Sequence, residues 1–417
     1  MTSTTQHNTQ TTANSPKADA DFSVRYKGYI PALDGLRGVA IALVVFHHFW
    51  PWVWSNPVYS ILTRVSHISW MGIDVFFVLS GFLISGILLD AREKQGYFKN
   101  FIMRRSLRIF PAYYLFLIFA LFVIPMLTGA HSSEGDADQL PNPLWYFFYG
   151  SNYLWFVQDT VIAQTLNTIP RAYDVPEYLG ITWSLAVEEQ FYLLWPFVIF
   201  AFYKQLRGVL LAAIPAVILI RGLIVLTISE WPDASYMASI CRADSLMMGA
   251  CLALYVRSNA MNKVTWRRII MGGLYFCLPA AIIWQVLIPG RSSEWFSVFG
   301  YSLLSLGCVG VLASVISNQL SWTHRIVTIK PLLWLGKYSY GIYLYHMIFW
   351  YLSHYWINAE VDPNGAPLVP GLFSPMGGSM LIDAPLRMIL CTGCSLICAW
   401  LSFHLYEKYF LKMKRFF

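Results

Sequence analysis

Long apolar stretches recur along most of the chain and are separated by short polar connections. The first, residues 33–54, reads LDGLRGVAIALVVFHHFWPWVW. About 20 mostly apolar residues suffice to cross the hydrocarbon core of a bilayer as a helix. Comparable stretches follow at residues 69–90, 107–129, 181–203, 207–229, 240–257, 268–288, 296–317, 331–354 and 381–406. This pattern predicts an all-α, polytopic membrane protein with about ten transmembrane helices.

Two segments depart from the pattern. Residues 1–24 are rich in Ser, Thr, Asn and Gln and nearly lack apolar side chains, which predicts a disordered tail. Residues 143–157, PLWYFFYGSNYLWFV, are too short to cross a bilayer comfortably and are rich in aromatic residues. Trp and Tyr favour the level of the lipid headgroups, so we expect this segment to be interfacial or re-entrant.

The distribution of charge predicts the orientation in the membrane. Lys and Arg gather in alternate connections, and cytoplasmic loops of membrane proteins attract these residues. We therefore expect both termini, including the tail at residues 1–24, in the cytoplasm. The basic connections carry Arg92, Lys94, Lys99, Arg104 and Arg105, then Lys204 and Arg207, then Arg257, Lys263, Arg267 and Arg268, then Arg325 and Lys330. The opposite connections carry only Arg64, Arg171 and Arg291.

Composition agrees with a membrane protein. The chain is 57% hydrophobic and only 12% charged, where a soluble domain carries about 25% charged residues. The net charge of +7 does not indicate a nucleic-acid partner, because the basic residues lie in short loops between apolar stretches. All seven cysteines lie in apolar stretches. The pair Cys391 and Cys394 has no second pair or histidine nearby, which favours helix packing over a metal or a disulfide.

Ionisable side chains inside the spans are the candidates for chemistry, because such groups are costly at membrane depth. Arg37 and His48 are eleven residues apart, so they share one helix face, with His48 about 16 Å further along the axis. His47 lies about 80° from that face. A histidine at this depth can instead form a structural hydrogen bond with a neighbouring helix, and this alternative stays open for His48 and for His346.

The predicted topology separates these groups into two zones. Arg37, Arg105 and Arg108 lie at the cytoplasmic end, and Arg105 and Arg108 share a helix face at a spacing of three residues. The alternative for these two arginines, within RRSLR, is a topology signal.

His48, Glu188 and His346 lie in the outer half of the membrane. Glu188 and Glu189 are adjacent, so only one of them can face a given partner. Asp74, near the start of its span, fits a helix cap.

Five motifs along residues 29–406 closely resemble those of the membrane-bound acyltransferase 3 family. They are IPALDGLRGVAIALVVFHHF, FIMRRSLRIFPAYYL, ITWSLAVEEQFYLLWP, CRADSLMMGACLA and YSYGIYLYH. The resemblance implies a ten-helix enzyme of the bacterial plasma membrane that takes an acyl group, usually acetyl, from cytoplasmic acyl-CoA. The acceptor it implies is a hydroxyl of a sugar in a surface polysaccharide, lipopolysaccharide or peptidoglycan, or sometimes of a lipid or antibiotic.

The resemblance also assigns residues. Arg37, Arg105 and Arg108 are expected to bind the phosphates of CoA, since planar guanidinium groups suit phosphate geometry. His48 is expected to deprotonate the acceptor hydroxyl, because an unperturbed imidazole pKa of about 6.5 lies near working pH. Glu188 is expected to orient His48, with His346 as a further catalytic candidate. Transient acylation of His48 remains an alternative.

The expected domain therefore spans residues 25–417, with no metal and without the C-terminal hydrolase-like domain that some relatives carry. Expected partners are acyl-CoA, a glycan or lipid-linked glycan acceptor, membrane lipids and proteins of glycan biosynthesis, and no nucleic acid. A transporter would also place charges at mid-membrane, but it would show internal repeats, which this sequence lacks. After an acyltransferase and a transporter, the third possible function is that of a non-catalytic assembly factor of a polysaccharide-export complex.

Overall fold

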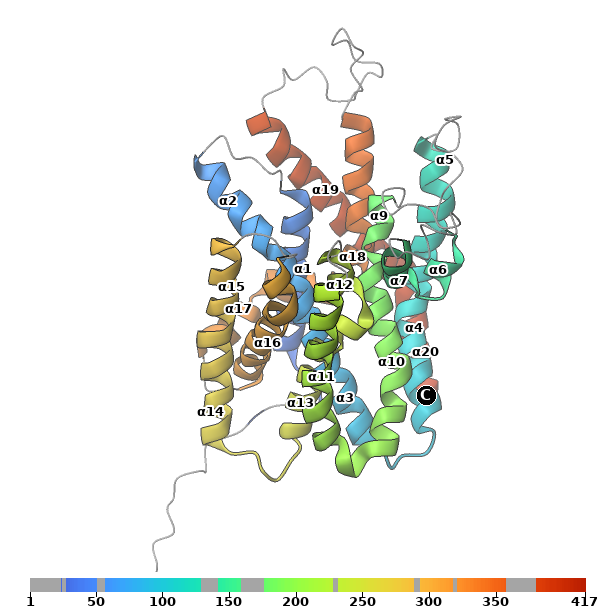
Figure 1. Ribbon diagram of the computed structural model, residues 1–417. Coiled ribbons are helices and arrows are strands. Elements are labelled where there is room, and N and C mark those ends of the chain that lie inside the picture. The colour runs from blue at the N-terminus through green and yellow to red at the C-terminus, as the bar shows by residue number, and fades with distance from the viewer. Residues whose placement is uncertain are drawn as a thin grey trace, which may run out of the picture.

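The computed structural model describes residues 24, 28–50, 57–128, 142–158, 176–227, 232–288, 293–317, 321–357 and 380–417. The described part is helical, apart from one isolated antiparallel bridge between Val24 and Ser317. The predicted disordered tail, residues 1–24, lies outside the described residues except for Val24. An all-α polytopic membrane protein is confirmed (Figure 1).

The helices of the described part follow in chain order. They are α1 (Pro31–Phe49), α2 (Pro57–Ile68), α3 (Gly72–Ala91), α4 (Tyr97–Ile118), α5 (Ile124–Thr128), α6 (Leu144–Phe147), α7 (Ser151–Gln158), α9 (Glu177–Gly180), α10 (Thr182–Phe202), α11 (Leu206–Thr227), α12 (Pro232–Met237), α13 (Ser239–Tyr255), α14 (Lys263–Gly272), α15 (Leu278–Leu287), α16 (Tyr301–Ile316), α17 (Ser321–Val327), α18 (Lys330–Ile357), α19 (Met380–Ser402) and α20 (Lys408–Met413). Short 3₁₀ or π turns join or extend several of them, at Ser69–Met71, Phe119–Val123, Tyr203–Gln205, Gly273–Cys277, Phe296–Gly300, Phe403–Glu407 and Lys414–Phe416.

Each of the ten predicted spans coincides with a helix, although only eight helical stretches within the described residues are long and apolar enough to cross a membrane. One stretch, Glu177–Thr227, is 51 residues long and contains two of the predicted spans. Figure 1 shows it turning back on itself, with α10 and α11 side by side. The tenth predicted span corresponds to α18, which is rich in Tyr and Trp and is not among the eight apolar stretches.

The composition of α18 follows from its place inside the bundle. Leu344 and His346 on this helix are completely buried, and Tyr338 and Tyr343 nearly so. Helices at the periphery instead expose large apolar side chains, as α11 does with Leu219, which is 65% exposed. A helix surrounded by protein can carry polar and aromatic groups that a helix facing lipid cannot.

Several pairs of helices cross in backbone contact at glycines. α1 lies along α18, and a Cβ atom built on Gly336 would stand 1.7 Å from the Asp34 carbonyl oxygen. A Cβ atom on Gly38 would stand 2.0 Å from the Leu332 carbonyl oxygen. Neither position has room for any side chain, so glycine is required for this approach.

The contact between α3 and α13 has the same form. A Cβ atom on Gly81 would stand 1.9 Å from the Leu246 carbonyl oxygen, and one on Gly249 would stand 2.1 Å from the Val78 carbonyl oxygen.

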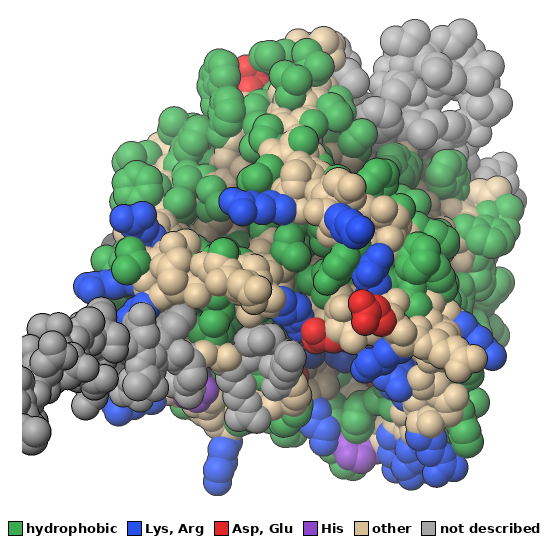
Figure 2. Space-filling view, turned by 90° about the horizontal axis from the view of Figure 1, so that it is seen from below, with side chains coloured by type: hydrophobic (Ala, Val, Ile, Leu, Met, Phe, Trp, Pro, Cys, Tyr) green, Lys and Arg blue, Asp and Glu red, His purple; other side chains and the backbone are tan. Residues whose placement is uncertain are grey.

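Lys and Arg side chains gather on the lower face of the bundle, which Figure 2 shows from below. The C-terminus lies toward that end in Figure 1. The predicted cytoplasmic location of the termini stays a prediction.

These contacts predict that Gly336→Ala destabilises the protein by about 1–3 kcal/mol, because the new methyl group must push two helix backbones apart. Gly393→Ala is the matched control, since nothing lies within 4 Å of a Cβ atom there and alanine favours a helix. Thermal melting of the detergent-purified variants measures the difference. Equal melting temperatures for the two variants would contradict the role given to the α1–α18 contact.

Candidate active site

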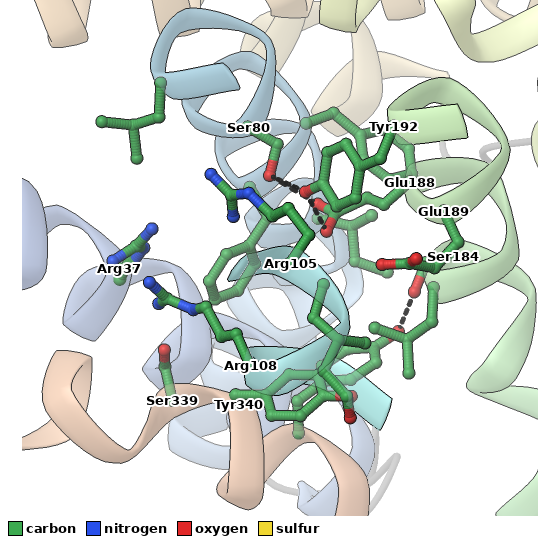
Figure 3. A pocket seen from close by; sticks show the side chains of 17 residues that line it. Arg37, Ser80, Arg105, Arg108, Ser184, Glu188, Glu189, Tyr192, Ser339 and Tyr340 are labelled. Carbon is green, nitrogen blue, oxygen red and sulfur yellow. Dashed lines mark hydrogen bonds between the residues drawn. The ribbon is translucent and has the colours of Figure 1, made fainter. Parts of the chain in front are cut away.

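A pocket with an empty volume of about 800 Å³ lies between α1, α3, α4, α10 and α18. The predicted donor arginines and Glu188 all line it, so the structure brings four of the six predicted site residues together (Figure 3). Its polar lining consists of Arg37, Ser80, Arg105, Arg108, Ser184, Glu188, Glu189, Tyr192, Ser339, Tyr340 and Tyr343. The apolar remainder comes mainly from α3, with Ile73, Phe76, Phe77 and Leu83.

The three arginines of the pocket differ in their partners. Arg37 Nη1 lies 3.3 Å from Asp34 Oδ1, one turn earlier on α1. Asp34 Oδ2 accepts a hydrogen bond of 2.7 Å from the Tyr29 hydroxyl, and this bond raises the pKa of the Tyr29 phenol. Arg105 places its guanidinium 5.3 Å from the centre of the Tyr192 ring. Arg108 is exposed into the pocket and makes neither an ion pair nor a side-chain hydrogen bond within the described part of the chain.

Glu188 is held by hydroxyl groups from two helices. Ser80 on α3 donates to Oε1 and Tyr192 on α10 donates to Oε2, each over 2.8 Å. Both carboxylate oxygens are therefore engaged at the wall of the pocket. The expected hydrogen bond from Glu188 to His48 is not formed in this arrangement. The sequence did carry a signal for one partner, because Tyr192 follows Glu188 by four residues on the same helix face.

Glu189 also lines the pocket and, like Glu188, lies to the right of Arg105 in Figure 3. Its Oε1 atom is buried and has no hydrogen-bond partner among the described residues. The two adjacent glutamates therefore have different surroundings, as expected for neighbours on a helix. Glu188 is fixed by hydroxyl donors, while Glu189 keeps an acceptor atom available inside the pocket.

His48 and His346 form a pair that does not line this pocket. His48 Nδ1 lies 3.3 Å from His346 Nε2 and 2.9 Å from the Val44 carbonyl oxygen. His346 Nδ1 lies 2.7 Å from the Tyr343 carbonyl oxygen. His47 turns away from this pair, with Nδ1 2.8 Å from the Ser66 carbonyl oxygen. The predicted difference in direction between the two neighbouring histidines is confirmed.

Carbonyl oxygens fix the tautomers of this pair. A carbonyl can only accept, so His346 Nδ1 carries the proton and its Nε2 is an acceptor when the ring is neutral. His48 Nδ1 then faces two acceptors and must be the protonated nitrogen. The basic nitrogen of neutral His48 is therefore Nε2, and the Val44 carbonyl oxygen determines this.

Tyr343 connects the histidine pair with the pocket. Its side chain lines the pocket and its hydroxyl is hydrogen-bonded to Ser184 and to the Ile181 carbonyl oxygen. Its own carbonyl accepts the bond from His346 one turn later. Sequence reasoning missed this residue, although its spacing of three from His346 within YSYGIYLYH was visible.

The aromatic segment predicted to be interfacial or re-entrant forms two short helices, α6 and α7, and is clamped onto the bundle. Tyr113 and Tyr114 on α4 donate to carbonyl oxygens of α6, over 2.8 and 3.1 Å. Gln190 on α10 donates to the Tyr149 carbonyl oxygen over 2.7 Å. Tyr149 has a φ of 53°, in the left-handed region that favours glycine, and its ring stacks on Tyr113. The segment is therefore a fixed wall beside the glutamate-bearing helix.

A second group of charges does not line the pocket, and each of its arginines is paired with a carboxylate. Arg242 bonds Asp74, and Arg221 Nη1 lies 3.1 Å from Asp244 Oδ2, with all four side chains completely buried. The alternative of a helix cap for Asp74 is wrong, because its side chain makes no cap hydrogen bond and bonds Arg242 on α13 instead. These pairs join α3, α11 and α13.

The family model described as "Acyltransferase domain" matches residues 30–404. The chain belongs to the membrane-bound acyltransferase 3 family. The family match indicates an acyltransferase domain with candidate membrane spans, rather than a transporter or a non-catalytic assembly factor. Within the described residues, no three His, Cys, Asp or Glu side chains are grouped so as to hold a metal ion.

Three bacterial relatives illustrate the match. A peptidoglycan O-acetyltransferase of Listeria monocytogenes is 32% identical over 339 residues, which cover 78% of this chain and 50% of the relative. A Bacillus subtilis protein, provisionally named a peptidoglycan O-acetyltransferase, is 31% identical over 76% of this chain and 48% of its own length. A Staphylococcus aureus protein, provisionally named an O-acetyltransferase, is 24% identical over 80% of this chain and 53% of its own length. The chain thus spans about half the length of these relatives, and no solved structure matches it.

The buried pair predicts that Asp74→Asn destabilises the acyltransferase by about 3–5 kcal/mol, because Arg242 is left without its counter-ion. Asp90→Asn is the control. Asp90 on α3 forms a bidentate pair with Arg257, two residues after the end of α13, but Asp90 is 40% exposed, so the loss should stay under about 1 kcal/mol. Thermal melting separates the two variants. Wild-type melting of Asp74→Asn would contradict a structural role for the buried pair.

Proposed function

We propose that the chain transfers an acyl group, typically acetyl, from acyl-CoA to a hydroxyl group of a cell-envelope glycan in the bacterial plasma membrane. The observation that carries the donor assignment is the unpaired charge of the pocket. Each of four other arginines in the bundle has a carboxylate within 3.3 Å, namely Arg37, Arg221, Arg242 and Arg257. Arg105 and Arg108 have none in the described residues, although both line the pocket.

Charges inside a protein are normally paired, because an isolated charge is costly to remove from water. Two unpaired guanidinium groups in one pocket are therefore suited to an anionic ligand, and their fork geometry fits phosphate oxygens. The diphosphate of CoA meets these requirements, with Arg37 as a third contact.

The proposed reaction uses the histidine pair above the pocket. His48 lies about 16 Å along α1 from Arg37, roughly the reach of an extended pantetheine arm. His48 Nε2 takes the proton of the acceptor hydroxyl as its oxygen attacks the thioester carbonyl carbon. The carbon–sulfur bond breaks, the acyl group stays on the acceptor, and the CoA thiolate leaves and is protonated. In this scheme His346 Nε2 accepts from His48 Nδ1, and the Tyr343 carbonyl oxygen accepts from His346 Nδ1.

Glu188 has a supporting role in this scheme. By accepting from Ser80 and Tyr192, it holds the Tyr192 ring against the Arg105 guanidinium.

A glycan acceptor is supported by the names of the relatives in Listeria and Bacillus, both peptidoglycan O-acetyltransferases. A donor entering from the face rich in Lys and Arg agrees with the position of Arg108, which lies on the same helix as exposed Arg104.

Arg105→Ala and Arg108→Ala should each weaken acetyl-CoA binding about 10- to 100-fold, because each removes a charge-assisted hydrogen bond of about 1.5–3 kcal/mol. Lysine at either position should restore binding only in part, since it lacks the planar fork. Isothermal titration of the purified protein in nanodiscs provides the measurement. Arg267→Ala, an exposed arginine on α14, is the control. Unchanged affinity in both pocket variants would reject the donor site.

His48→Ala should lower acyl transfer by about 10²- to 10⁴-fold, the usual contribution of a general base, while acetyl-CoA binding stays unchanged. His47→Ala should be mild, because that ring bonds the Ser66 carbonyl oxygen instead. The assay follows labelled acetyl from acetyl-CoA to glycan in membrane vesicles. An equal loss of transfer in both variants would reject His48 as the base.

A further inference from the structure

The last turn of the described chain lies against α4. After α19 the chain continues through the π turn Phe403–Glu407 into α20 and the 3₁₀ turn Lys414–Phe416, and all three segments pack on α4. Figure 1 shows α20 and the C-terminus beside α4. This segment of α4 carries Arg104, Arg105 and Arg108. Lys414 lies within electrostatic reach of all three arginines.

Three cations of this cluster lack a direct ion pair. Arg104, Arg108 and Lys414 make neither an ion pair nor a side-chain hydrogen bond within the described part of the chain, and Lys414 is half-buried. The nearby carboxylate, Glu407, is buried, accepts from Ser402 over 2.7 Å and interacts with Arg108. Asp34 also interacts with Arg108, and Glu188 and Glu189 interact with Arg105, but Arg104 and Lys414 form no ion pair in the described residues and still repel their cationic neighbours. An added anion would relieve that repulsion.

The cluster continues from the pocket toward the last turn of the chain. Arg105 and Arg108 line the pocket, whereas Arg104 and Lys414 do not. Arg104 and Arg108 are four residues apart, so they are neighbours on the helix surface. The cations therefore form two adjoining groups, one inside the pocket and one between α4 and the last turn of the chain. A ligand with two separate anionic groups would contact both.

CoA has this distribution of charge, with a diphosphate and a separate phosphate on the ribose 3′-oxygen. We propose that Lys414 and Arg104 bind the ribose 3′-phosphate of the donor, so that the enzyme distinguishes CoA from 3′-dephospho-CoA. This assignment rests on the proposed function, because it takes CoA as the donor. A phosphate of an anionic lipid headgroup has the same chemistry, so the test must separate the two sources.

Isothermal titration of the full chain in phosphatidylcholine nanodiscs tests the assignment with CoA and 3′-dephospho-CoA as ligands. The wild type should bind CoA about tenfold or more tightly than 3′-dephospho-CoA. Lys414→Ala and Arg104→Ala should lower the affinity for CoA toward that for 3′-dephospho-CoA, and leave the latter unchanged. Lys414→Arg should keep the preference. Lys412→Ala, an exposed lysine on α20, is the matched control and should behave as wild type.

Two results would overturn the assignment: equal affinity of the wild type for both ligands, or an equal loss for both ligands in Lys414→Ala. Absence of binding of either ligand to the wild type would reject the CoA donor of the proposed function instead. Repeating the titration with phosphatidylglycerol in the nanodiscs separates the phosphate sources. If this lipid abolishes the wild-type preference for CoA as Lys414→Ala does, the cluster binds lipid headgroups and the assignment fails. A preference that persists supports it.

Discussion

Backbone contact between helices at glycines is the constraint on which the arrangement of the site depends. Gly38 and Gly336 allow α1 and α18 to touch, and this contact brings His48 to His346 across 298 residues of sequence. The second contact, at Gly81 and Gly249, fixes α3 against α13, and α3 supplies Ser80 to Glu188. Lipid tails are as apolar as the helices, so close packing of small residues decides which helices pair.

The charges buried by this packing are of two kinds. Arg221 and Arg242 meet carboxylates and serve as links between helices, which they can do without any ligand. Arg105 and Arg108 meet none in the described residues and are exposed to a pocket instead. Burial alone therefore does not identify a functional charge in this membrane domain. What separates the two kinds is whether the protein itself supplies the opposite charge.

The sequence predicted the spans and the grouping of Arg37, Arg105 and Arg108, because hydropathy and helical periodicity report depth and direction along one helix. It did not predict lateral neighbours. Glu188 was assigned to His48 by depth, yet its partners are Ser80 and Tyr192. Which helices adjoin depends on their order around the bundle, and a pattern within one span carries no information about that order. For the same reason, Tyr343 and the unpartnered oxygen of Glu189 emerged only from the packed structure.

The burial of α18 has a consequence for biogenesis. A helix this rich in Tyr, Trp and Ser gains little free energy by leaving the translocon for lipid alone. Its stable environment is a groove already built by earlier helices, above all α1, which the ribosome delivers hundreds of residues before it. The histidine pair therefore forms only when insertion is nearly complete. Partly synthesised or truncated chains that end before α18 would hold His48 without His346, its partner in the pair.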